Sequence, residues 1–467
     1  MELTGQRSGM DYRLLDRIGS GGEGDIYKVD GNKYAAKVYK PGTLDDRLLN
    51  KLEYMIANPP NEAVYTQVAW PLDFAADENG NRLGFIMPNL GLATQLLLEV
   101  YPYNSSYTLL QKLTIAQNIC VVISKVHEAG YVFGDFNPQN IGVDPSSGKV
   151  SFFDTDTYHV LDSASGETYR CMVAAQGYVA PELLEKCANF ARSNSKESKN
   201  LYANVPLPTF SHETDNFALA VHIFKLLQNG YTPFGGIIES ASVSTASPGA
   251  GDAAVRRNNY CFRPGFKHQS SAIMPLDVFP SEIANLFTRA FIGGKDNPNN
   301  RPNAADWHGA LERLENNLTQ CKNNPLHQYY KMNITCPQCE ADKRYKTATS
   351  TGNRKKSSAG LKQKTFVSST HTQATQNQPS MTNPVRKIVS KEVMKTALKG
   401  FLIGAILLIL IGPSILADLF GTIVTTVDSW FSTIFEVVEP MGHLLPAALL
   451  IIGLTICVYI YNKYRRK

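Results

Sequence analysis

A glycine-rich pattern near the start of the chain constrains the fold most strongly, because it fixes how the chain turns between two strand-like runs. Gly19, Gly21 and Gly24 form a G-x-G-x-x-G motif, with Ile26 two residues further on. The motif lies between YRLLDRI and DIYKVD, and no helix-like segment follows it. Dinucleotide-binding folds use the same letters but place a helix directly after them. The pattern therefore indicates either a hairpin whose backbone N–H groups cover phosphates or an ordinary glycine-rich turn.

A lysine in the next strand-like run fits the phosphate-binding interpretation. The run KYAAKVYK carries Lys37, and a strand lysine beneath a glycine flap can contact the α- and β-phosphates when a carboxylate orients it. The helix-like stretch TLDDRLLNKLEYMIA that follows offers Glu53, among apolar residues expected on its inward face. Glu62 is the competing carboxylate, but the sequence NPP before it ends the helix. We therefore expect Glu53 to orient Lys37.

Two downstream segments carry the polar groups that phosphoryl transfer to a hydroxyl requires. The stretch FGDFNPQN contains Asp135 and Asn140, and the strand-like run VSFF ends next to Asp154. A carboxylate such as Asp135 can accept the proton of the incoming hydroxyl, while Asn140 and Asp154 offer oxygen ligands for magnesium. Each motif is weak alone. The order of flap, lysine, helix glutamate, Asp/Asn loop and strand-end aspartate is a strong joint signal.

In this order the motifs resemble those of the eukaryotic-type (Hanks) protein kinases, from about Tyr12 to Glu315. The resemblance is closest to a bacterial serine/threonine kinase group that includes helix-hairpin-helix-tailed kinases and in which KLEYMIANPP, GFIMP and GD-x-N-P-x-N recur. GYVAPE is similar to the end of a kinase activation segment, which implies that Glu182 pairs with the late Arg301. The helix-like TDNFALAVHIF implies that Asp215 braces the catalytic loop.

The resemblance implies an α+β, two-lobe protein-kinase-like fold over residues 12–317. A small β-rich N-lobe would cover about 12–87 and a larger helical C-lobe about 91–317, with ATP and magnesium between them. The stretch GFIMPNL would be the hinge, with Met87 as gatekeeper and the next three residues contacting adenine. The implied ATP-binding residues are Gly19, Gly21, Gly24, Ile26, Lys37, Met87, Pro88, Asn89 and Leu90.

Three departures from the kinase pattern leave other functions open. Phe133-Gly134 replaces His-Arg, which removes the arginine that would grip a phosphorylated activation loop. Asn137 replaces a lysine that touches the transferred group, and Thr155-Asp156 replaces Phe-Gly, so that Asp156 could join the metal site. The alternatives are a pseudokinase, an ATP-binding signalling or scaffold module, and a small-molecule kinase. No proton-accepting or metal-binding residue is lost, and small-molecule kinases lack the Ala-Pro-Glu segment, so we expect a functional protein kinase.

A Cys/His segment at 318–343 predicts a small zinc module. CPQC is a compact C-x2-C pair, and a preceding cysteine and histidine would complete a closed tetrahedral Cys3His site of the structural kind. The predicted ligands are Cys321, His327, Cys336 and Cys339. The other cysteines are scattered and give no disulfide framework, so the alternative is a set of unpaired thiols in a reducing compartment.

The C-terminal part of the sequence predicts a membrane anchor. A basic, Ser/Thr-rich stretch at 344–384 has too few large apolar groups to order itself and should be a disordered linker, and uncharged apolar runs follow at 400–417 and 444–461. Basic residues flank these runs, the second group in the tail 462–467, whereas 418–443 between them has no Lys or Arg. By the positive-inside rule both ends are cytoplasmic. This favours a transmembrane helical hairpin with a short extracytoplasmic or interfacial loop over two buried core helices.

Composition sets limits on the partners. The net charge of +5 collects in the linker and the tail, as is typical of membrane flanks, so we expect no nucleic-acid partner. We therefore expect a kinase anchored in the cytoplasmic membrane that transfers the ATP γ-phosphoryl group to Ser/Thr hydroxyls of proteins, itself included. Membrane lipid would be a partner, and the resemblance implies a cognate metal-dependent protein phosphatase as another.

Overall fold

The computed structural model describes residues 1–352, except for 92, 195–200 and 240–250. These residues belong to the compact unit Met1–Ser368. Several predicted segments lie outside the described residues, namely most of the linker 344–384 and all of 400–417, 418–443, 444–461 and 462–467.

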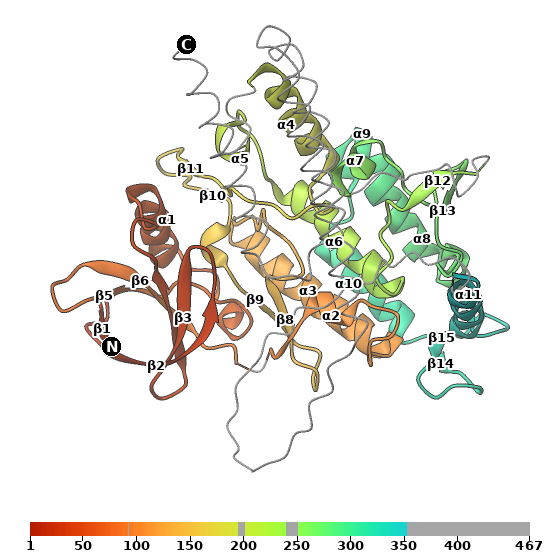
Figure 1. The fold of residues 1–467 in the computed structure, drawn as a ribbon, viewed down its shortest axis with the longest axis horizontal. Helices are drawn as coiled ribbons and strands as arrows, with labels where there is room; N and C mark the ends of the chain where they lie inside the picture. The colour runs from red at the N-terminus through yellow and green to blue at the C-terminus, as the bar shows by residue number, and fades with distance from the viewer. Residues whose placement is uncertain (92, 195–200, 240–250, 353–467) are drawn as a thin grey trace, which may run out of the picture. The chain divides into compact units, whose positions relative to one another are not determined.

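Six antiparallel strands close into a barrel that forms the N-lobe (Figure 1). Pairing follows the order β1-β2-β3-β4-β6-β5, and β1 pairs with β5 to close the ring. The strands are β1 (Glu2–Gly5), β2 (Asp11–Ser20), β3 (Gly24–Val29), β4 (Tyr34–Tyr39), β5 (Asp73–Ala76) and β6 (Arg82–Pro88). The barrel begins before the predicted lobe boundary at residue 12, because Leu3 of β1 is buried opposite Tyr12 of β2.

Glycine at two positions lets strand β4 lie very close to its neighbours. A Cβ on Gly84 of β6 would stand 1.8 Å from the carbonyl oxygen of Lys37, and one on Gly24 of β3 would stand 2.6 Å from that of Val38. Any side chain at these distances would force the backbones apart. The strand that carries Lys37 is therefore held from both sides by residues without side chains.

Helix α1 (Asp46–Ala57) packs against the lobe through one face. Asp45 caps its first turn by accepting a hydrogen bond from the Leu48 N–H at 2.8 Å. The buried residues recur at helical spacing and define the inward face: Lys51, Leu52, Met55 and Ile56. This face thus carries one charged side chain among apolar ones.

The C-lobe is mainly helical, and α3 packs against both α6 and α10 (Figure 1). Its helices of four residues or more are α2 (Leu97–Val100), α3 (Leu109–Glu128), α4 (Pro181–Ser193), α5 (Leu201–Asn204), α6 (His212–Leu227), α7 (Gly251–Arg256), α8 (Ser281–Thr288), α10 (Ala304–Glu315) and α11 (Pro337–Gly352). Within the described residues α3 is the one helix long and apolar enough to cross a membrane. Its buried apolar residues belong to the main hydrophobic core, as expected for a core helix of a globular lobe.

Short strands and turns complete the lobe. A three-stranded sheet has the order β7 (Gln95–Leu96), β8 (Ile141–Val143) and β9 (Val150–Phe152). The two-stranded pairs are β10 (Val160–Leu161) with β11 (Thr168–Tyr169), β12 (Gly236–Ile238) with β13 (Phe266–His268), and β14 (Leu318–Gln320) with β15 (Gln328–Tyr330). The remaining short elements of the C-lobe are η2 (Thr155–Thr157), η4 (Leu276–Val278), the π-helical η5 (Arg289–Gly293), α9 (Gly294–Asp296) and η6 (Pro298–Asn300). One further turn, η1 (Glu62–Thr66), precedes β5 in the N-lobe.

A seam between the lobes lies where β9 meets the segment before β5. The Phe152 N–H donates to the Gln67 carbonyl at 2.7 Å, and the Ala69 N–H donates back to the Phe152 carbonyl at 2.9 Å. The Thr155 hydroxyl donates to the Ala69 carbonyl at 2.7 Å. The turn η2, which belongs to the C-lobe chain, is thereby attached to the N-lobe.

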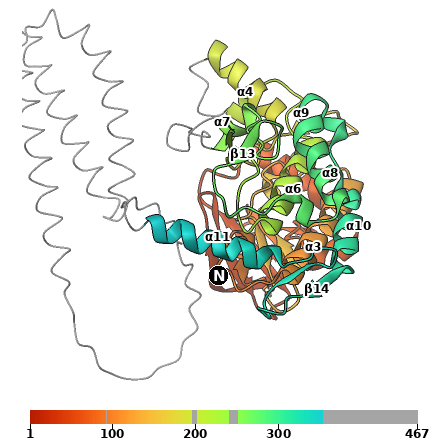
Figure 2. The same ribbon diagram turned by 90° about the vertical axis from the view of Figure 1, so that its right-hand side faces the viewer.

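A hairpin and a helix extend the C-lobe past α10. Strand β14 pairs with β15, and α11 runs along the side of the lobe (Figure 2). Ala341 of α11 belongs to the main core, and the ring of Tyr345 stacks on that of Tyr103 with centroids 4.5 Å apart. The helix runs to Gly352, past the boundary that the sequence predicts after residue 343.

We expect Gly84→Ala to lower the free energy of unfolding by about 3 kcal/mol, because the new methyl group would overlap the Lys37 carbonyl and force β4 and β6 apart. Gly22→Ala is the matched control, since a Cβ there meets nothing within 4 Å. Urea denaturation followed by tryptophan fluorescence measures both. Equal midpoints for the two variants would show that the strands separate without cost.

Candidate functional site

The loop that carries Asp135 is held by a buried carboxylate on the first turn of α6. Asp215 accepts hydrogen bonds from the N–H groups of Phe133 at 2.8 Å and Gly134 at 3.1 Å, and its Oδ2 lies 2.9 Å from Nε2 of His127. Asp215 is buried, so these charge-assisted bonds are shielded from water. The structure places Asp215 beneath the loop, as the resemblance implied.

The conformation of Gly134 explains why an arginine is absent from this loop. Its φ of +72° lies in the left-handed region, and a Cβ there would stand 2.7 Å from Cβ of Cys171. Both conditions exclude a side chain. The preceding residue, Phe133, packs its ring against Phe152 and Tyr158, with centroids 5.0 and 4.7 Å away. The Phe-Gly pair therefore fits the local packing, and a side chain at Gly134 does not.

Two amide side chains orient Asp135. Nδ2 of Asn137 donates to Oδ2 of Asp135 at 2.7 Å, and Nδ2 of Asn140 donates to the same oxygen at 3.0 Å. Burial raises the pKa of Asp135 above its ordinary value, although both amide bonds oppose the shift, and the carboxylate is correspondingly more basic. The Asn140 carbonyl accepts the N–H of Phe153 at 2.9 Å, which places the loop beside the residue before Asp154.

Lys37 reaches the site from the barrel. Its Nζ lies 2.6 Å from Oδ2 of Asp156 and 3.5 Å from Oδ1 of Asp154. Burial alone would lower the pKa of Lys37, but the charges of Asp156 and Asp154 outweigh burial and raise it. Asp154 adopts the left-handed conformation at φ 51° and ψ 45°, and its side chain is 49% exposed. Asp154 is therefore open to a ligand, whereas the side chain of Asp156 is 1% exposed.

Asp156 is surrounded by groups from the N-lobe. The Tyr39 hydroxyl donates to its Oδ2 at 2.5 Å, and Nζ of Lys51 on α1 donates to its carbonyl oxygen at 2.6 Å. Burial opposes the charge of Asp156, but the neighbouring Lys37 ammonium holds its pKa below the ordinary value. The sequence suggested Asp156 only as a further metal ligand, and it gave no role to Tyr39 or Lys51. The signal for Tyr39 was its spacing of two from Lys37, which puts both on one face of the strand.

Glu53 does not occupy the position predicted for it. Its side chain is 62% exposed and lies 3.3 Å from Nη1 of Arg82. Successive helical residues are about 100° apart, so Glu53 points away from the face that its neighbour Leu52 buries. The competitor Glu62 is also exposed. The Lys37–Glu53 pair is not formed, and Asp156 supplies the carboxylate instead.

The glycine motif forms a hairpin between β2 and β3. Gly19 lies opposite Ile26, and the N–H of Gly21 donates to the Gly24 carbonyl at 2.9 Å. Ile26 is in turn the cross-strand neighbour of Lys37 on β4. The hairpin and the lysine are therefore adjacent, as the phosphate-binding interpretation requires.

The segment predicted to be the hinge lies where β6 leaves the barrel. Met87 is buried and Pro88 ends the strand. The Asn89 N–H donates to the Lys33 carbonyl at 3.0 Å, and Leu90 packs against the N-lobe core. These residues thus lie together, and the Asn89 N–H donates its hydrogen bond to the turn between β3 and β4.

Arg301 and Glu182 form the second predicted pair. The guanidinium donates to both carboxylate oxygens, at 2.8 and 2.6 Å, in the bidentate geometry that makes such pairs strong. It also donates to the carbonyl oxygens of Glu213 at 2.9 Å and Gly294 at 2.7 Å. The buried arginine therefore joins α4, α6 and α9.

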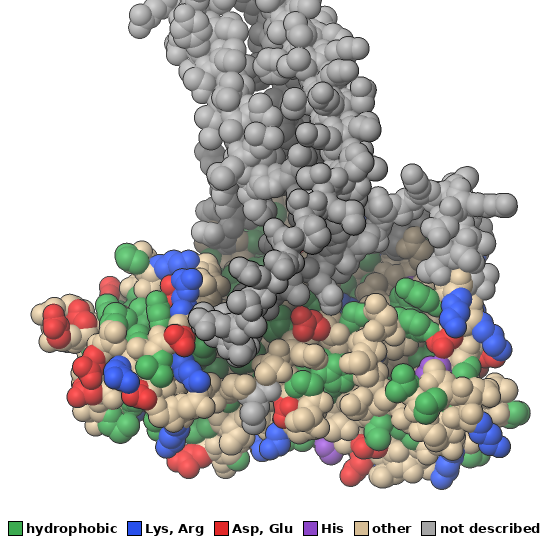
Figure 3. Space-filling model, turned by 60° about the horizontal axis from the view of Figure 1, so that its bottom comes forward, with side chains coloured by type: hydrophobic (Ala, Val, Ile, Leu, Met, Phe, Trp, Pro, Cys, Tyr) green, Lys and Arg blue, Asp and Glu red, His purple; other side chains and the backbone are tan. Residues whose placement is uncertain are grey.

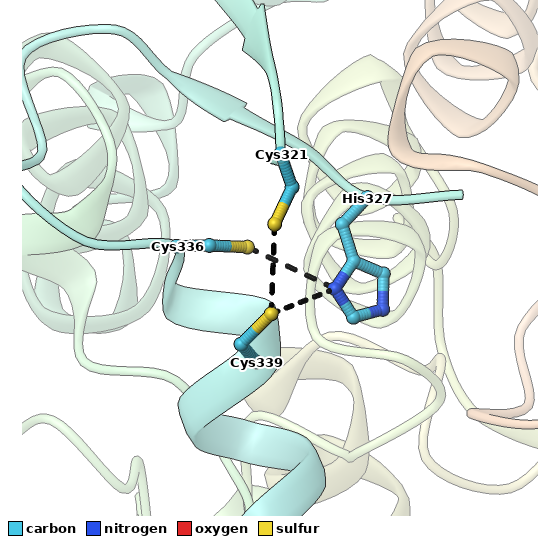
Figure 4. Close-up of side chains that lie close together, drawn as sticks. All are labelled: Cys321, His327, Cys336 and Cys339. Carbon is cyan, nitrogen blue, oxygen red and sulfur yellow. Dashed lines mark hydrogen bonds between the residues drawn. The ribbon is translucent and has the colours of Figure 1, made fainter. Parts of the chain in front are cut away.

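Three thiols and an imidazole converge between the β14–β15 hairpin and the start of α11 (Figure 4). They are the predicted residues Cys321, His327, Cys336 and Cys339, with potential ligand atoms all within 4.8 Å of one another. Sγ of Cys339 lies 3.6 Å from Sγ of Cys321 and 3.4 Å from Nδ1 of His327. Ligands of a tetrahedral zinc at about 2.0–2.3 Å would be about 3.3–3.8 Å apart. The cluster fits a zinc ion in size and in donor chemistry.

A carboxylate that the sequence did not predict lies behind the imidazole. Oδ2 of Asp342 is 3.6 Å from Nε2 of His327, whose Nδ1 faces the thiols. A carboxylate beside Nε2 favours the tautomer that leaves Nδ1 free to bind metal, although the Asn324 amide lies closer to Nε2, at 3.0 Å. Asp342 follows Cys339 by three residues on α11, and this helical spacing was the available signal.

We expect Gly134→Ala to destabilise the fold by about 3 kcal/mol, because it combines left-handed strain with overlap against Cys171. Adding Cys171→Gly should restore part of this loss, since it removes both side-chain atoms that the new methyl group would overlap and leaves the strain. Urea denaturation of both single variants and the double variant measures the coupling. A Gly134→Ala variant as stable as the parent would contradict the packing explanation of this loop.

Comparison with known proteins finds bacterial relatives named as kinases. Two curated proteins named Protein kinase YegI, from Escherichia coli (strain K12) and Escherichia coli O157:H7, are 28% and 29% identical to the chain over 344 residues. The matches cover 70% of this chain and 48% of each relative, so the chain spans about half the length of the curated relatives it matches. No model of a known protein family matches the chain. The similarity supports a bacterial protein kinase-like relationship.

Proposed function

We propose that the chain is a eukaryotic-type protein kinase that transfers the γ-phosphoryl group of ATP to serine or threonine hydroxyls of proteins, itself included. The observation that carries this proposal is a continuous set of bonds across the two lobes. Lys37 bonds to Asp154, the residue before Asp154 bonds to Asn140, and Asn140 bonds to Asp135. A lysine, two metal-binding oxygens and a proton acceptor are the groups that phosphoryl transfer needs.

Each group has a distinct role in the proposed reaction. Asp135 accepts the proton of the substrate hydroxyl, and the burial that raises its pKa makes it a better base at neutral pH. Lys37 contacts the α- and β-phosphates. Asn140 and Asp154 hold magnesium, which prefers oxygen ligands and supplies charge neutralisation on the phosphates.

The proposed partners are proteins and the membrane. The Ala-Pro-Glu segment, whose Glu182 is held by Arg301, favours protein acceptors over metabolites by resemblance. On the described part of the face in Figure 3, side chains of both signs are interspersed, which suits protein partners better than nucleic acid. We propose that the apolar runs 400–417 and 444–461 anchor the chain in the cytoplasmic membrane, with a metal-dependent phosphatase as a further partner. Their lack of charge and their basic flanks support the anchor.

We also propose that the Cys/His cluster holds a structural zinc ion. Three thiolates and one imidazole fill a tetrahedral shell, which leaves no open position for chemistry. The ion would tie the β14–β15 hairpin, which contacts α3, to α11.

We expect one zinc ion per purified chain, and loss of that ion in Cys336→Ser, because three ligands hold zinc far more weakly than four. Cys187→Ser is the control, since this buried thiol lies on α4 outside the cluster. Elemental analysis by mass spectrometry gives the stoichiometry. Metal-free parent protein, or equal zinc in Cys336→Ser and the parent, would contradict the assignment.

The kinase proposal is tested with the purified full chain, radiolabelled ATP, magnesium and an acceptor protein. We expect Asp135→Asn to lower the labelling rate by about 10²–10⁴-fold, since a positioned base contributes about this much. Asp16→Asn, which removes an exposed carboxylate on β2, should match the parent. Phosphoamino-acid analysis of the product tests Ser/Thr specificity. Equal labelling by the parent and Asp135→Asn would refute the proposal, and ATP turnover on a metabolite without labelled protein would favour a small-molecule kinase.

A further inference from the structure

The carboxylate that contacts Lys37 most closely does not come from a helix. Oδ2 of Asp156 lies 2.6 Å from the Lys37 ammonium. Glu53 of α1 follows the buried Leu52 in sequence, but its side chain is exposed and paired with Arg82. The buried face of α1 carries Lys51 as its one charged residue. Helix α1 therefore presents a cation to the site, and the counter-charge for Lys37 comes from η2.

The surroundings of Asp156 make this counter-charge a fixed part of the fold. Its side chain is 1% exposed, and Oδ2 accepts bonds from both Lys37 and Tyr39. Its other oxygen, Oδ1, is buried and accepts no hydrogen bond from the described residues. The Lys37 ammonium, 2.6 Å from Oδ2, is therefore the main group that offsets the cost of burying this charge. Removal of either ion would leave the other buried without its closest opposite charge, which strongly favours the paired state.

The backbone of Asp156 is anchored as firmly as its side chain. Nζ of Lys51 donates to the Asp156 carbonyl at 2.6 Å, and Thr155 beside it donates its hydroxyl to the Ala69 carbonyl of the N-lobe at 2.7 Å. The helix α1, the barrel and η2 thus meet at one residue.

We propose that Asp156 is the positioning residue for Lys37, and that it replaces a helix glutamate as the group that holds the ammonium ready for the α- and β-phosphates. The inference rests on the proposed kinase function. Asp154, which is left open for metal, lies two residues before Asp156 in the same turn. The segment Asp154–Asp156 therefore carries both the carboxylate left open for metal and the carboxylate that holds the Lys37 ammonium.

Asp156→Asn is the informative variant, because it keeps the size of the side chain and an acceptor for Tyr39 but removes the charge. At saturating ATP and magnesium we expect kcat per folded full-length chain to fall about 100-fold, as displaced catalytic groups typically cause. Glu53→Gln, which removes the exposed carboxylate of α1, should stay within about two-fold of the parent. Activity of Asp156→Asn at or above that of the parent would identify an inhibitory lock on Lys37 and overturn the proposal. An equal loss in Glu53→Gln would overturn it as well.

A double-variant cycle separates positioning from a general effect on folding. Lys37→Met combined with Asp156→Asn removes both charges, so that neither ion is left buried without its counter-charge. If Asp156 acts through Lys37, adding Asp156→Asn to Lys37→Met causes no further loss of residual kcat or of ATP affinity measured by titration calorimetry. A further loss of about tenfold would show a role independent of the lysine and overturn the proposal.

The same variants distinguish this inference from the proposed function. If the parent transfers no phosphoryl group, the proposed function fails, and ATP affinity decides the role of Asp156 alone. We then expect the Kd for ATP to rise about tenfold in Asp156→Asn and to stay unchanged in Glu53→Gln. An unchanged Kd in Asp156→Asn would overturn the inference.

Discussion

A lysine ammonium buried between two lobes requires a charge beside it, and much of the site follows from how this chain supplies one. Removing an ion from water costs several kcal/mol, which a close partner with good hydrogen bonds can offset. Lys37 is 6% exposed, and Asp156 meets this need with help from Tyr39 and Lys51. Because these groups come from β4, α1 and η2, satisfying one charge brings the barrel, the helix and the C-lobe chain together.

The loop around Asp135 shows a division between residues that pack against the core and polar residues that bond to each other. Phe133 and Gly134 are set by their neighbours: the ring lies among other aromatic rings, and the glycine fits against Cys171 at a positive φ. Asp135 and Asn140 are instead bonded to each other beside the half-exposed Asp154. Two of the departures from the kinase pattern, Phe133 and Gly134, thus fall on the packed side of the loop, where a different neighbour allows a different residue.

The sequence predicted the parts of the site that depend on a residue and its immediate motif. The glycine hairpin, the Asp215 brace, the Arg301–Glu182 pair and the Cys/His cluster lie where their motifs indicated. The prediction for Glu53 was wrong because the buried face of α1 contains its neighbour Leu52, and one step along a helix turns the side chain by about 100°. The contact between Lys37 and Asp156 spans 119 residues of sequence and arises only when the lobes meet. No local pattern in the sequence encodes that contact.

The boundaries were also only partly predictable. The strand β1 is short and polar in sequence, and its membership of the barrel depends on pairing with both β2 and β5. The helix α11 extends beyond the predicted module because its first turns pack against the C-lobe through Ala341 and Tyr345. Such ends are decided by tertiary contacts, which override the polar composition of the segment.

The Cys/His cluster has a thermodynamic consequence for the end of this domain. With an ion bound, Cys321 and Cys339 are cross-linked across 18 positions of chain, as a disulfide would link them in an oxidising environment. A metal cross-link of this kind lowers the entropy of the unfolded chain. The stabilisation that it gives depends on the concentration of free metal and on thiol oxidation rather than on the burial of apolar surface. The stability of α11 would then depend on the supply of metal and reductant in the cell, whereas the stability of the barrel would not.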